Sequence, residues 1–186
     1  AVTYTLNEWF GARVTVATTG ILMNDEMDDF TVKPGVPNFY GLVQGEANAI
    51  APGKRPLSSM SPTIVSRDGK PVLVIGAPGG SRIITVVVHL ILNTVDYGMN
   101  LQEAIDAPRF HQQWLPESTS VEEFALSPDT RRILTDMGHK FNDGRPWSHA
   151  IGIIVGAPSF GGTTRDGNRF YGANDPRRNT GMALGY

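Results

Sequence analysis

The sequence predicts a mixed α/β fold, with strands near both ends of the chain and helices between them. Three observations predict it. Short β-branched runs flank Asp68-Gly69, an apolar run over 83–95 is too long for an ordinary strand, and strand-like runs over 150–155 and 168–172 flank a glycine-rich loop. The chain has 186 residues, of which 40% are hydrophobic and 18% charged. This composition is typical of a soluble globular protein that buries one sizeable core.

The first ten residues alternate between apolar and polar, as a strand does. The two faces of this strand would carry Val2, Tyr4 and Leu6, and Thr3, Thr5, Asn7 and Trp9, respectively. A second short strand is expected over 13–17. Because strands seldom open a protein without a lead-in, we expect the N-terminus to be cleaved or truncated.

The middle of the chain begins with two strands, expected over 63–66 and 72–75. Asp68-Gly69 between them is a hairpin signal, because both residues tolerate the left-handed backbone that a tight turn requires. The apolar run over 83–95 then predicts a buried helix. His89 lies inside this run, and we expect it to be a packed core residue rather than a base.

Two further helices carry recognisable start and stop signals. Asn100 with Glu103 three positions later is typical of a capped helix start, and this short helix would end before Pro108. Ser127-Pro128 begins another helix, since proline is tolerated in the first turn, and Gly138 ends it.

The segment 33–54 is the irregular part of the chain and is rich in proline and glycine. A segment this long without structure of its own is usually functional or disordered. Phe39 and Tyr40 in its middle favour a lid-like loop that packs over a site. The sequence contains no internal repeat and no sign of a second domain, so we expect a single domain over 1–186.

Several classes of function are excluded by composition. The net charge is −2 without a run of lysine or arginine, which argues against nucleic acid or an anionic membrane as partner. The absence of cysteine excludes disulfides, thiolate catalysis and cysteine zinc sites. The four histidines are scattered, without the spacing of metal ligands. We therefore expect no metal and no cofactor.

The stretch from Gly76 to Arg82, Gly-Ala-Pro-Gly-Gly-Ser-Arg, joins a predicted strand to the buried helix. Such a junction leaves backbone N–H groups unpaired at the helix start, and glycines let a ligand approach them closely. The stretch lacks the Gly-Lys-Ser/Thr ending of a P-loop and the Rossmann glycine pattern. Stabilisation of an acyl-transfer oxyanion is the remaining use. The alternative is a tight turn that packs helix on sheet.

Four carboxylates gather in a short apolar context that could hold an ammonium group. They are Asp25, Glu26, Asp28 and Asp29. The apolar neighbours are Leu22, Met23, Met27 and Phe30. The alternative is a solvated acidic turn. Paired-carboxylate glycosidase chemistry is conceivable, but the spacing does not favour it.

The stretch from Leu57 to Pro62 offers hydroxyl groups just before a predicted strand. Serines before proline are common turn residues, so a turn is the simpler interpretation. No Gly-x-Ser-x-Gly elbow is present, and a serine-hydrolase nucleophile is therefore poorly supported.

Motifs across nearly the whole chain resemble one family. They are Thr-Tyr-Thr-Leu-Asn at 3–7, Gly-Ile-Leu at 20–22, Met-Asp-Asp-Phe at 27–30, Lys-Pro-Gly-Val-Pro-Asn at 33–38, Lys-Arg-Pro-Leu-Ser-Ser-Met-Ser-Pro-Thr at 54–63, Pro-Gly-Gly-Ser-Arg-Ile-Ile at 78–84, Ala-Pro-Arg-Phe-His at 107–111 and Gly-Ala-Asn-Asp-Pro-Arg at 172–177. With these motifs the chain resembles the small, catalytic subunit of a bacterial-type γ-glutamyltransferase. The resemblance implies an α+β N-terminal-nucleophile hydrolase fold, an αββα sandwich of two stacked antiparallel sheets between helix layers, completed by a large-subunit chain.

The resemblance also implies the reaction. Members of this family cleave their own precursor, and the new N-terminal threonine of the small subunit is the nucleophile, with its α-amine as base. The γ-glutamyl group of glutathione or another γ-glutamyl amide passes to this threonine, and then to water or to an amino acid or peptide. Gly79 and Gly80 match the oxyanion-hole glycines of the family, and Thr5 matches the threonine that hydrogen-bonds the nucleophile.

The donor-binding residues of the family also have counterparts here. Asn7, Glu26 and Asp29 match residues that hold the α-amino and α-carboxyl groups of the donor. The matches continue with Ser58 and Ser59 for the α-carboxylate and Tyr40 for the lid. Trp9 shares a strand face with Thr5 and Asn7, and we expect it to lie near the acceptor amine, with Trp147 in a similar role. The alternative is that both tryptophans simply pack.

Residue 1 is alanine, and the nucleophile of the family lies upstream of it. Neither Thr3 nor Thr5 replaces it, because neither has an unblocked α-amine. We therefore expect a fragment of the small subunit that lacks its first strand. Two other interpretations stay open: a related acylase acting on glutaryl β-lactam side chains or a capsule-type transpeptidase, and a γ-glutamyl-binding protein without a nucleophile. A glutaryl donor has no amino group and does not need Glu26 and Asp29.

The resemblance further implies a partner and a location. The partner is a large subunit from the same precursor, which forms a heterodimer with this chain and contacts the α-carboxylate of the donor. Bacterial members of the family are periplasmic or secreted, and we expect the same here.

Overall fold

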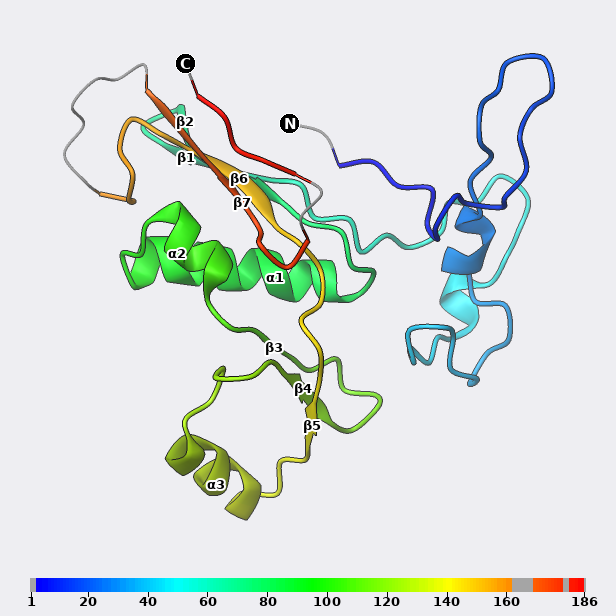
Figure 1. Ribbon diagram of the computed structural model, residues 1–186. Coiled ribbons are helices and arrows are strands. Elements are labelled where there is room, and N and C mark those ends of the chain that lie inside the picture. The colour runs from blue at the N-terminus through cyan, green and yellow to red at the C-terminus, as the bar shows by residue number, and fades with distance from the viewer. Residues whose placement is uncertain (1–2, 162–168, 179–180, 186) are drawn as a thin grey trace. The chain divides into compact units, whose positions relative to one another are not determined.

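The computed structural model describes residues 3–161, 169–178 and 181–185 (Figure 1). They fall into two compact units, which we describe separately. The N-terminal unit is Tyr4–Ser59. The sheet unit is Met60–Tyr186 together with the first three residues. The single domain expected over 1–186 stays a prediction.

The sheet unit is built on four antiparallel strands in the order β1-β2-β6-β7. They are β1 (Thr63–Arg67), β2 (Lys70–Gly76), β6 (Ile151–Val155) and β7 (Phe170–Asn174). The β1–β2 hairpin turns at Asp68 and Gly69, with φ of 51° and 74°, as the sequence predicts. The last predicted strand begins later than expected, at Phe170, while Asn168 lies outside the described residues.

Two helices cover one face of this sheet (Figure 1). Helix α1 (Arg82–Ile91) continues into a π-helical turn (Leu92–Asp96), which confirms the buried helix predicted over 83–95. Helix α2 (Leu101–Asp106) begins with the predicted capping box, in which the side chains of Asn100 and Glu103 accept from each other's backbone N–H. The core lies between the two layers and includes Leu73, Ile75, Val86, Leu90, Leu101, Ile105 and Ile154.

The opposite face of the four-stranded sheet carries exposed apolar side chains. Cross-strand neighbours share a face, and the register pairs Ile64 with Val74 and Val74 with Ile153. Ile64, Ile153 and Phe170 on this outer face are all exposed. The sheet unit thus contributes one sheet with helices on one side. In the described part of the chain, no helix is long and apolar enough to span a bilayer.

A second, small sheet lies beyond the helices, in the order β3-β4-β5 (Figure 1). Its strands are β3 (Phe110–His111), β4 (Thr119–Val121) and β5 (Phe141–Asp143). Strands of two or three residues are too short to show an alternating pattern, so the sequence does not predict them. Helix α3 (Pro128–Asp136) connects β4 to β5, starting at Ser127 and ending before Gly138 as predicted.

The N-terminal unit consists mainly of turns. It contains two single-turn 3₁₀ helices, η1 (Glu26–Asp29) and η2 (Glu46–Asn48). The strand predicted for the start of the chain is wrong over the described residues 3–10, because Asn7 and Phe10 have φ of 71° and 62° and break the extended backbone. The strand predicted over 13–17 is also wrong: it reduces to an isolated bridge between Thr15 and Leu22.

Candidate functional site

The loop between β2 and α1 places the two predicted oxyanion-hole glycines at the start of a buried helix. Gly79 and Gly80 have φ of 136° and 58°, and their carbonyls accept from the N–H groups of Arg82 and Ile83 at 3.2 and 3.1 Å. Among the residues that the structure describes, none accepts a hydrogen bond from the N–H of Gly79 or Gly80. The positive end of the α1 dipole adds to these donors. The loop can therefore bind an anion or an oxyanion.

Gly79 is also required for space. A Cβ atom built on it would lie 3.2 Å from both Cβ and Oγ of Ser148, which is tighter than ordinary packing. Ser148 donates a hydrogen bond from Oγ to the carbonyl of Pro78. On the other side of the glycine pair, Ser81 Oγ donates to Gln113 Oε1 at 2.7 Å.

In the N-terminal unit, helix η1 carries the predicted ammonium-binding carboxylates. Glu26 and Asp29 are half-buried and hydrogen-bonded to each other. Burial, this hydrogen bond and the charges of Asp29 and Asp25 raise the pKa of Glu26 to about 7. Near neutrality the pair therefore holds a proton part of the time. A bound ammonium group could replace this proton and restore both negative charges.

The segment with Thr5 and Asn7 lies against the start of this acidic helix. The N–H of Asn7 donates to Thr5 Oγ1 at 2.8 Å, and Asn7 Nδ2 lies 3.4 Å from the carbonyl of Asp25. Asp25 also accepts from the N–H of Glu8 through Oδ1 at 3.0 Å. The structure thus brings Asn7 to Asp25, one residue before Glu26. Thr5 Oγ1 accepts from the backbone here, and its own hydrogen can be donated elsewhere.

Tyr40 connects the loop 33–54 to the same segment. Its hydroxyl donates to Glu8 Oε1 at 2.7 Å, and burial together with this contact raises the pKa of Tyr40. The tip of the loop is held by Asn38, whose Oδ1 accepts from the N–H groups of Tyr40 and Leu42. Closure of this loop as a lid stays a prediction.

Asn48 is a connecting residue that sequence reasoning missed. Its Nδ2 donates to the carbonyl of Asp29 at 2.7 Å, and its Oδ1 accepts from the N–H of Leu57 at 3.0 Å. It therefore joins the acidic helix to the segment that continues into Ser58 and Ser59. Ser58 is exposed and Ser59 is half-buried. A single asparagine in a loop gives no sequence signal that could have found this role.

The predicted site residues are divided between the two units. The N-terminal unit contains Thr5, Asn7, Trp9, Glu26, Asp29, Tyr40, Ser58 and Ser59, and the sheet unit contains Gly79 and Gly80. Trp9 is 65% exposed, and its placement near an acceptor stays a prediction. Trp147 is buried, with its ring against His111 and the Arg82 guanidinium 5.1 Å from the ring centre. The surroundings of Trp147 therefore agree with the alternative that this side chain packs in the interior.

Four buried charges behind α2 form a network that the sequence did not indicate. Arg109 donates to Asp175 Oδ2 at 2.6 Å, and Arg177 donates to Glu122 Oε2 at 2.6 Å and to Asp175 Oδ1 at 3.1 Å. Glu122 also accepts from the N–H of Trp147, and Asp175 from the N–H of Ala150. The network fixes the segment from residue 147 to residue 150, which contains Ser148.

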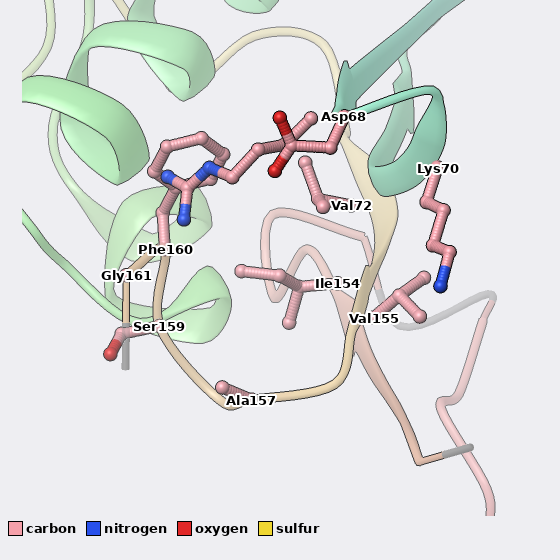
Figure 2. A pocket seen from close by; sticks show the side chains of 10 residues that line it. Asp68, Lys70, Val72, Ile154, Val155, Ala157, Ser159, Phe160 and Gly161 are labelled. Atoms are coloured by element: carbon pink, nitrogen blue, oxygen red, sulfur yellow. The ribbon is translucent and has the colours of Figure 1, made fainter. Parts of the chain in front are cut away.

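A cavity of about 290 Å³ lies at the other end of β2 from the glycine loop (Figure 2). It is lined by Arg67, Asp68, Val72, Ile154 and Phe160 among others, and the Arg67 guanidinium lies 4.3 Å from the Phe160 ring centre. No predicted site residue is among the described residues that line it.

The sequence matches proteins of one family along its length. Residues 1–185 match the family described as Gamma-glutamyltranspeptidase. A glutathione hydrolase proenzyme of Pseudomonas sp. (strain A14) is 69% identical, covering 100% of this chain and 32% of that protein. That of Escherichia coli (strain K12) is 52% identical, covering 100% and 30%. The chain therefore spans about a third of the length of these curated relatives.

Solved structures give the same result. The Helicobacter pylori gamma-glutamyltranspeptidase T380A mutant matches with a TM-score of 0.86 at 49% identity, over 95% of this chain and 92% of that chain. A cephalosporin acylase from Bacillus halodurans is more distant, with a TM-score of 0.71 at 26% identity, over 90% of this chain and 28% of that chain.

Proposed function

The chain belongs to the gamma-glutamyltranspeptidase family, and from that membership we propose that it is the small-subunit part of an enzyme that transfers γ-glutamyl groups. The donor is glutathione or another γ-glutamyl amide, and the acceptor is water or the amine of an amino acid or peptide. The observation that carries this proposal is the 69% identity over all 186 residues to a glutathione hydrolase proenzyme.

The proposed reaction is acyl transfer in two steps. Cleavage of the precursor upstream of residue 1 leaves a threonine as the new N-terminus. Its hydroxyl oxygen attacks the γ-carbonyl carbon, and its free α-amine takes the hydroxyl proton. The N–H groups of Gly79 and Gly80 donate to the oxyanion that forms, and Thr5 donates to the nucleophile. The tetrahedral intermediate collapses, the C–N bond breaks, and the departing amine takes the proton. Water or an acceptor amine then attacks the γ-glutamyl ester in the same way.

The α-amino and α-carboxyl groups of the donor are held by the N-terminal unit. Glu26 and Asp29 bind the ammonium group, and the raised pKa of Glu26 supports this role because a cation would relieve the repulsion between the two carboxyls. Asn7 orients the bound group. Ser58 and Ser59 donate to the α-carboxylate.

A glutaryl acylase is the second candidate, supported by the likeness to the cephalosporin acylase. It is the weaker candidate because a glutaryl donor carries no ammonium group. Such a donor would offer no positive charge to offset the repulsion between Glu26 and Asp29. A binding protein without a nucleophile is the third. It would bind a γ-glutamyl compound but never release the amine.

The test compares two donors on the enzyme made from its full precursor. We expect amine release from a γ-glutamyl anilide to exceed release from the matching glutaryl anilide by about a hundredfold or more in kcat/KM. In Glu26→Gln this preference should shrink, while Glu46→Gln, which changes an exposed carboxyl group of the same unit, serves as a matched control. The reverse preference would support the acylase, and saturable binding without amine release would support the binding protein.

We also propose that the large subunit comes from the same precursor and that the enzyme is periplasmic or secreted. The relatives are named proenzymes and are about three times as long as this chain, which supports a second, larger product. Fractionation of native cells, followed by denaturing gel analysis of the purified enzyme, tests both points. Two chains in the periplasmic or external fraction are expected, whereas activity confined to the cytoplasm, or a single uncleaved chain in the active enzyme, would contradict the corresponding proposal.

A further inference from the structure

Two side chains from outside the glycine loop hold it on either side of Gly79 and Gly80. Ser148, just before β6, donates to the carbonyl of Pro78. Gln113, just after β3, accepts from Ser81 Oγ at 2.7 Å. The two glycines lie between these anchor points.

Gln113 is itself fixed by its neighbours. Its Nε2 donates to the carbonyl of Leu115 at 3.0 Å, and its Oε1 lies 2.9 Å from Nε2 of the buried His111. His111 Nδ1 lies 2.8 Å from Thr85 Oγ1 on helix α1. The chain of contacts therefore starts on α1 at Thr85 and returns to the beginning of the same helix at Ser81.

The direction of these hydrogen bonds follows from their chemistry. The Gln113 Oε1 atom has only lone pairs, so it accepts from both Ser81 and His111. His111 must then carry a proton on Nε2, which leaves Nδ1 to accept from the Thr85 hydroxyl. Burial lowers the pKa of His111, in agreement with this neutral form. In this series of contacts from Thr85 to Ser81, which we call the relay, each hydrogen-bond donor then faces an acceptor.

Such support is needed because a glycine pair has a large conformational freedom. Oxyanion donors act well only when they are held within about 0.5 Å of their productive position. The φ of Ser148 is 64°, a left-handed conformation that a non-glycine residue adopts at a cost, and such residues gather at functional sites.

We propose that Gln113 is a positioning residue: through its contact with Ser81, backed by His111, it fixes the N–H groups of Gly79 and Gly80 for the oxyanion. This inference rests on the proposed function. Gln113 does not touch the substrate. Its effect is therefore expected on the transition state and not on donor binding.

The test uses the enzyme made from its full precursor, with Gln113→Met, which keeps the size of the side chain but removes the acceptor oxygen. We expect kcat to fall by about tenfold or more, with KM close to wild type, since loss of an oxyanion donor costs a hundredfold or more and a displaced donor less. Affinity for a boronic acid analogue of glutamate, which forms a tetrahedral adduct, should fall by a similar factor. Affinity for glutamate itself should stay unchanged.

Gln112→Met is the matched control. Gln112 is the adjacent, exposed glutamine, whose Oε1 accepts from the N–H of Trp114 at 2.7 Å, away from the relay. Its kcat should stay within about twofold of wild type. Gln113→Glu keeps an acceptor for Ser81 and should recover most of the lost kcat. Ser81→Ala removes the same contact from the other side, so its effect and that of Gln113→Met should not add in the double variant.

Equal kcat values in Gln113→Met and Gln112→Met would overturn the inference. A loss shared equally by kcat, glutamate affinity and boronate affinity, or effects of Ser81→Ala and Gln113→Met that add fully, would overturn it too. If Gln113→Met does not fold, Ser81→Ala and Gln113→Glu decide by the same comparison. A wild-type enzyme that releases no amine from a γ-glutamyl donor would instead refute the proposed function, and this inference with it.

Discussion

Two carboxyl groups on one turn of helix η1, those of Glu26 and Asp29, share a hydrogen bond in the N-terminal unit. Burial, this hydrogen bond and the charges of Asp29 and Asp25 together raise the pKa of Glu26 to about 7. A substrate ammonium group offsets the repulsion between the carboxylates. The charge of the pair therefore changes around neutral pH.

We expect the KM for a γ-glutamyl donor in hydrolysis to fall by about tenfold as pH rises from about 6 to about 8. Below its pKa Glu26 is protonated and the pair has lost one negative charge, whereas above it both charges face the ammonium. Steady-state kinetics across this range measure the effect. In Glu26→Gln the profile should flatten, with KM raised about tenfold at the alkaline end, and an unchanged profile in this variant would rule out Glu26 as the titrating group.

Gly79→Ala is expected to lower kcat by about a hundredfold with little change in KM. The added methyl group meets Ser148 at 3.2 Å, and a φ of 136° strains any side chain, so the loop must shift and carry its N–H donors with it. Gly98→Ala is the control, because Gly98 also has a positive φ, 68°, but its Cβ would meet nothing within 4 Å. Comparable losses of kcat in both variants would show that backbone strain alone is responsible.

Among the elements, those with local signals were predictable. The Asp68-Gly69 hairpin, the capping box of α2 at Asn100 and the Ser127 start of α3 each depend on residues adjacent in sequence. The fold class is confirmed by the solved relatives. The strand predicted from the alternating pattern at the N-terminus was wrong. Residues with a left-handed backbone, such as Asn7, turn the chain there, and the alternation of apolar and polar residues does not indicate this.

The site was predictable only in part, for a similar reason. The role of the glycine loop at Gly79 and Gly80 was predictable, because the loop lies between a strand and the start of a helix. Contacts between distant segments do not follow from a single sequence: Gln113 reaches Ser81 across 32 positions, and Arg109 reaches Asp175 across 66. Charged residues such as Arg109 are usually exposed, so their burial could not be expected from composition.

The buried network of Arg109, Glu122, Asp175 and Arg177 joins α2, the end of β4 and the segment after β7. The sheet unit should therefore be less stable when the network is broken. Asp175→Asn removes the charge that Arg109 and Arg177 face and should lower the free energy of unfolding by about 3–5 kcal/mol. Denaturant unfolding of the assembled enzyme measures this. Asp143→Asn breaks the exposed pair with Arg131, where Asp143 is 72% exposed, and should cost less than about 1 kcal/mol. If Asp175→Asn and Asp143→Asn lowered the free energy of unfolding equally, the buried network would contribute no more to stability than the exposed pair.

The same network has a defined pH dependence. Burial alone would raise the pKa values of Glu122 and Asp175. Hydrogen bonds from the Arg177 side chain and from the backbone lower the pKa of Glu122 below its ordinary value of 4.5. Backbone hydrogen bonds and the Arg109 guanidinium lower the pKa of Asp175 below its ordinary value of 3.8. A carboxyl whose folded pKa is depressed stabilises the fold above its unfolded pKa, and this stability is lost as pH falls through the folded value. The melting temperature should therefore drop below about pH 4.5, and Asp175→Asn should weaken that drop. A drop of the same size in Asp175→Asn would exclude Asp175 as its source.

At the scale of the whole molecule, the outer face of the four-stranded sheet is apolar and exposed, including Ile64, Ile153 and Phe170. The curated relatives are about three times as long as this chain. We propose that the large subunit from the same precursor covers this face.

Ile153→Glu should therefore weaken association with the large subunit by about 2 kcal/mol or more, since it places a charge in the middle of an apolar contact. Co-purification of the two subunits, titrated with salt or denaturant, measures this. Ile133→Glu on α3 is the control, because Ile133 is exposed to a similar extent, 51% against 43% for Ile153. Association unchanged by Ile153→Glu would contradict the proposed cover.

A γ-glutamyl ester on the nucleophile would add its mass to the subunit that contains this sequence, and intact-mass analysis detects it. The enzyme from the full precursor is mixed with a γ-glutamyl donor, quenched in acid within the first turnover, and analysed with its N-terminal residue. We expect a subunit that begins with threonine and gains the mass of one γ-glutamyl group, and this gain should disappear when an acceptor amine is added. A subunit that binds the donor at saturation but gains no mass would show that no γ-glutamyl ester forms, and the proposed acyl transfer would be wrong.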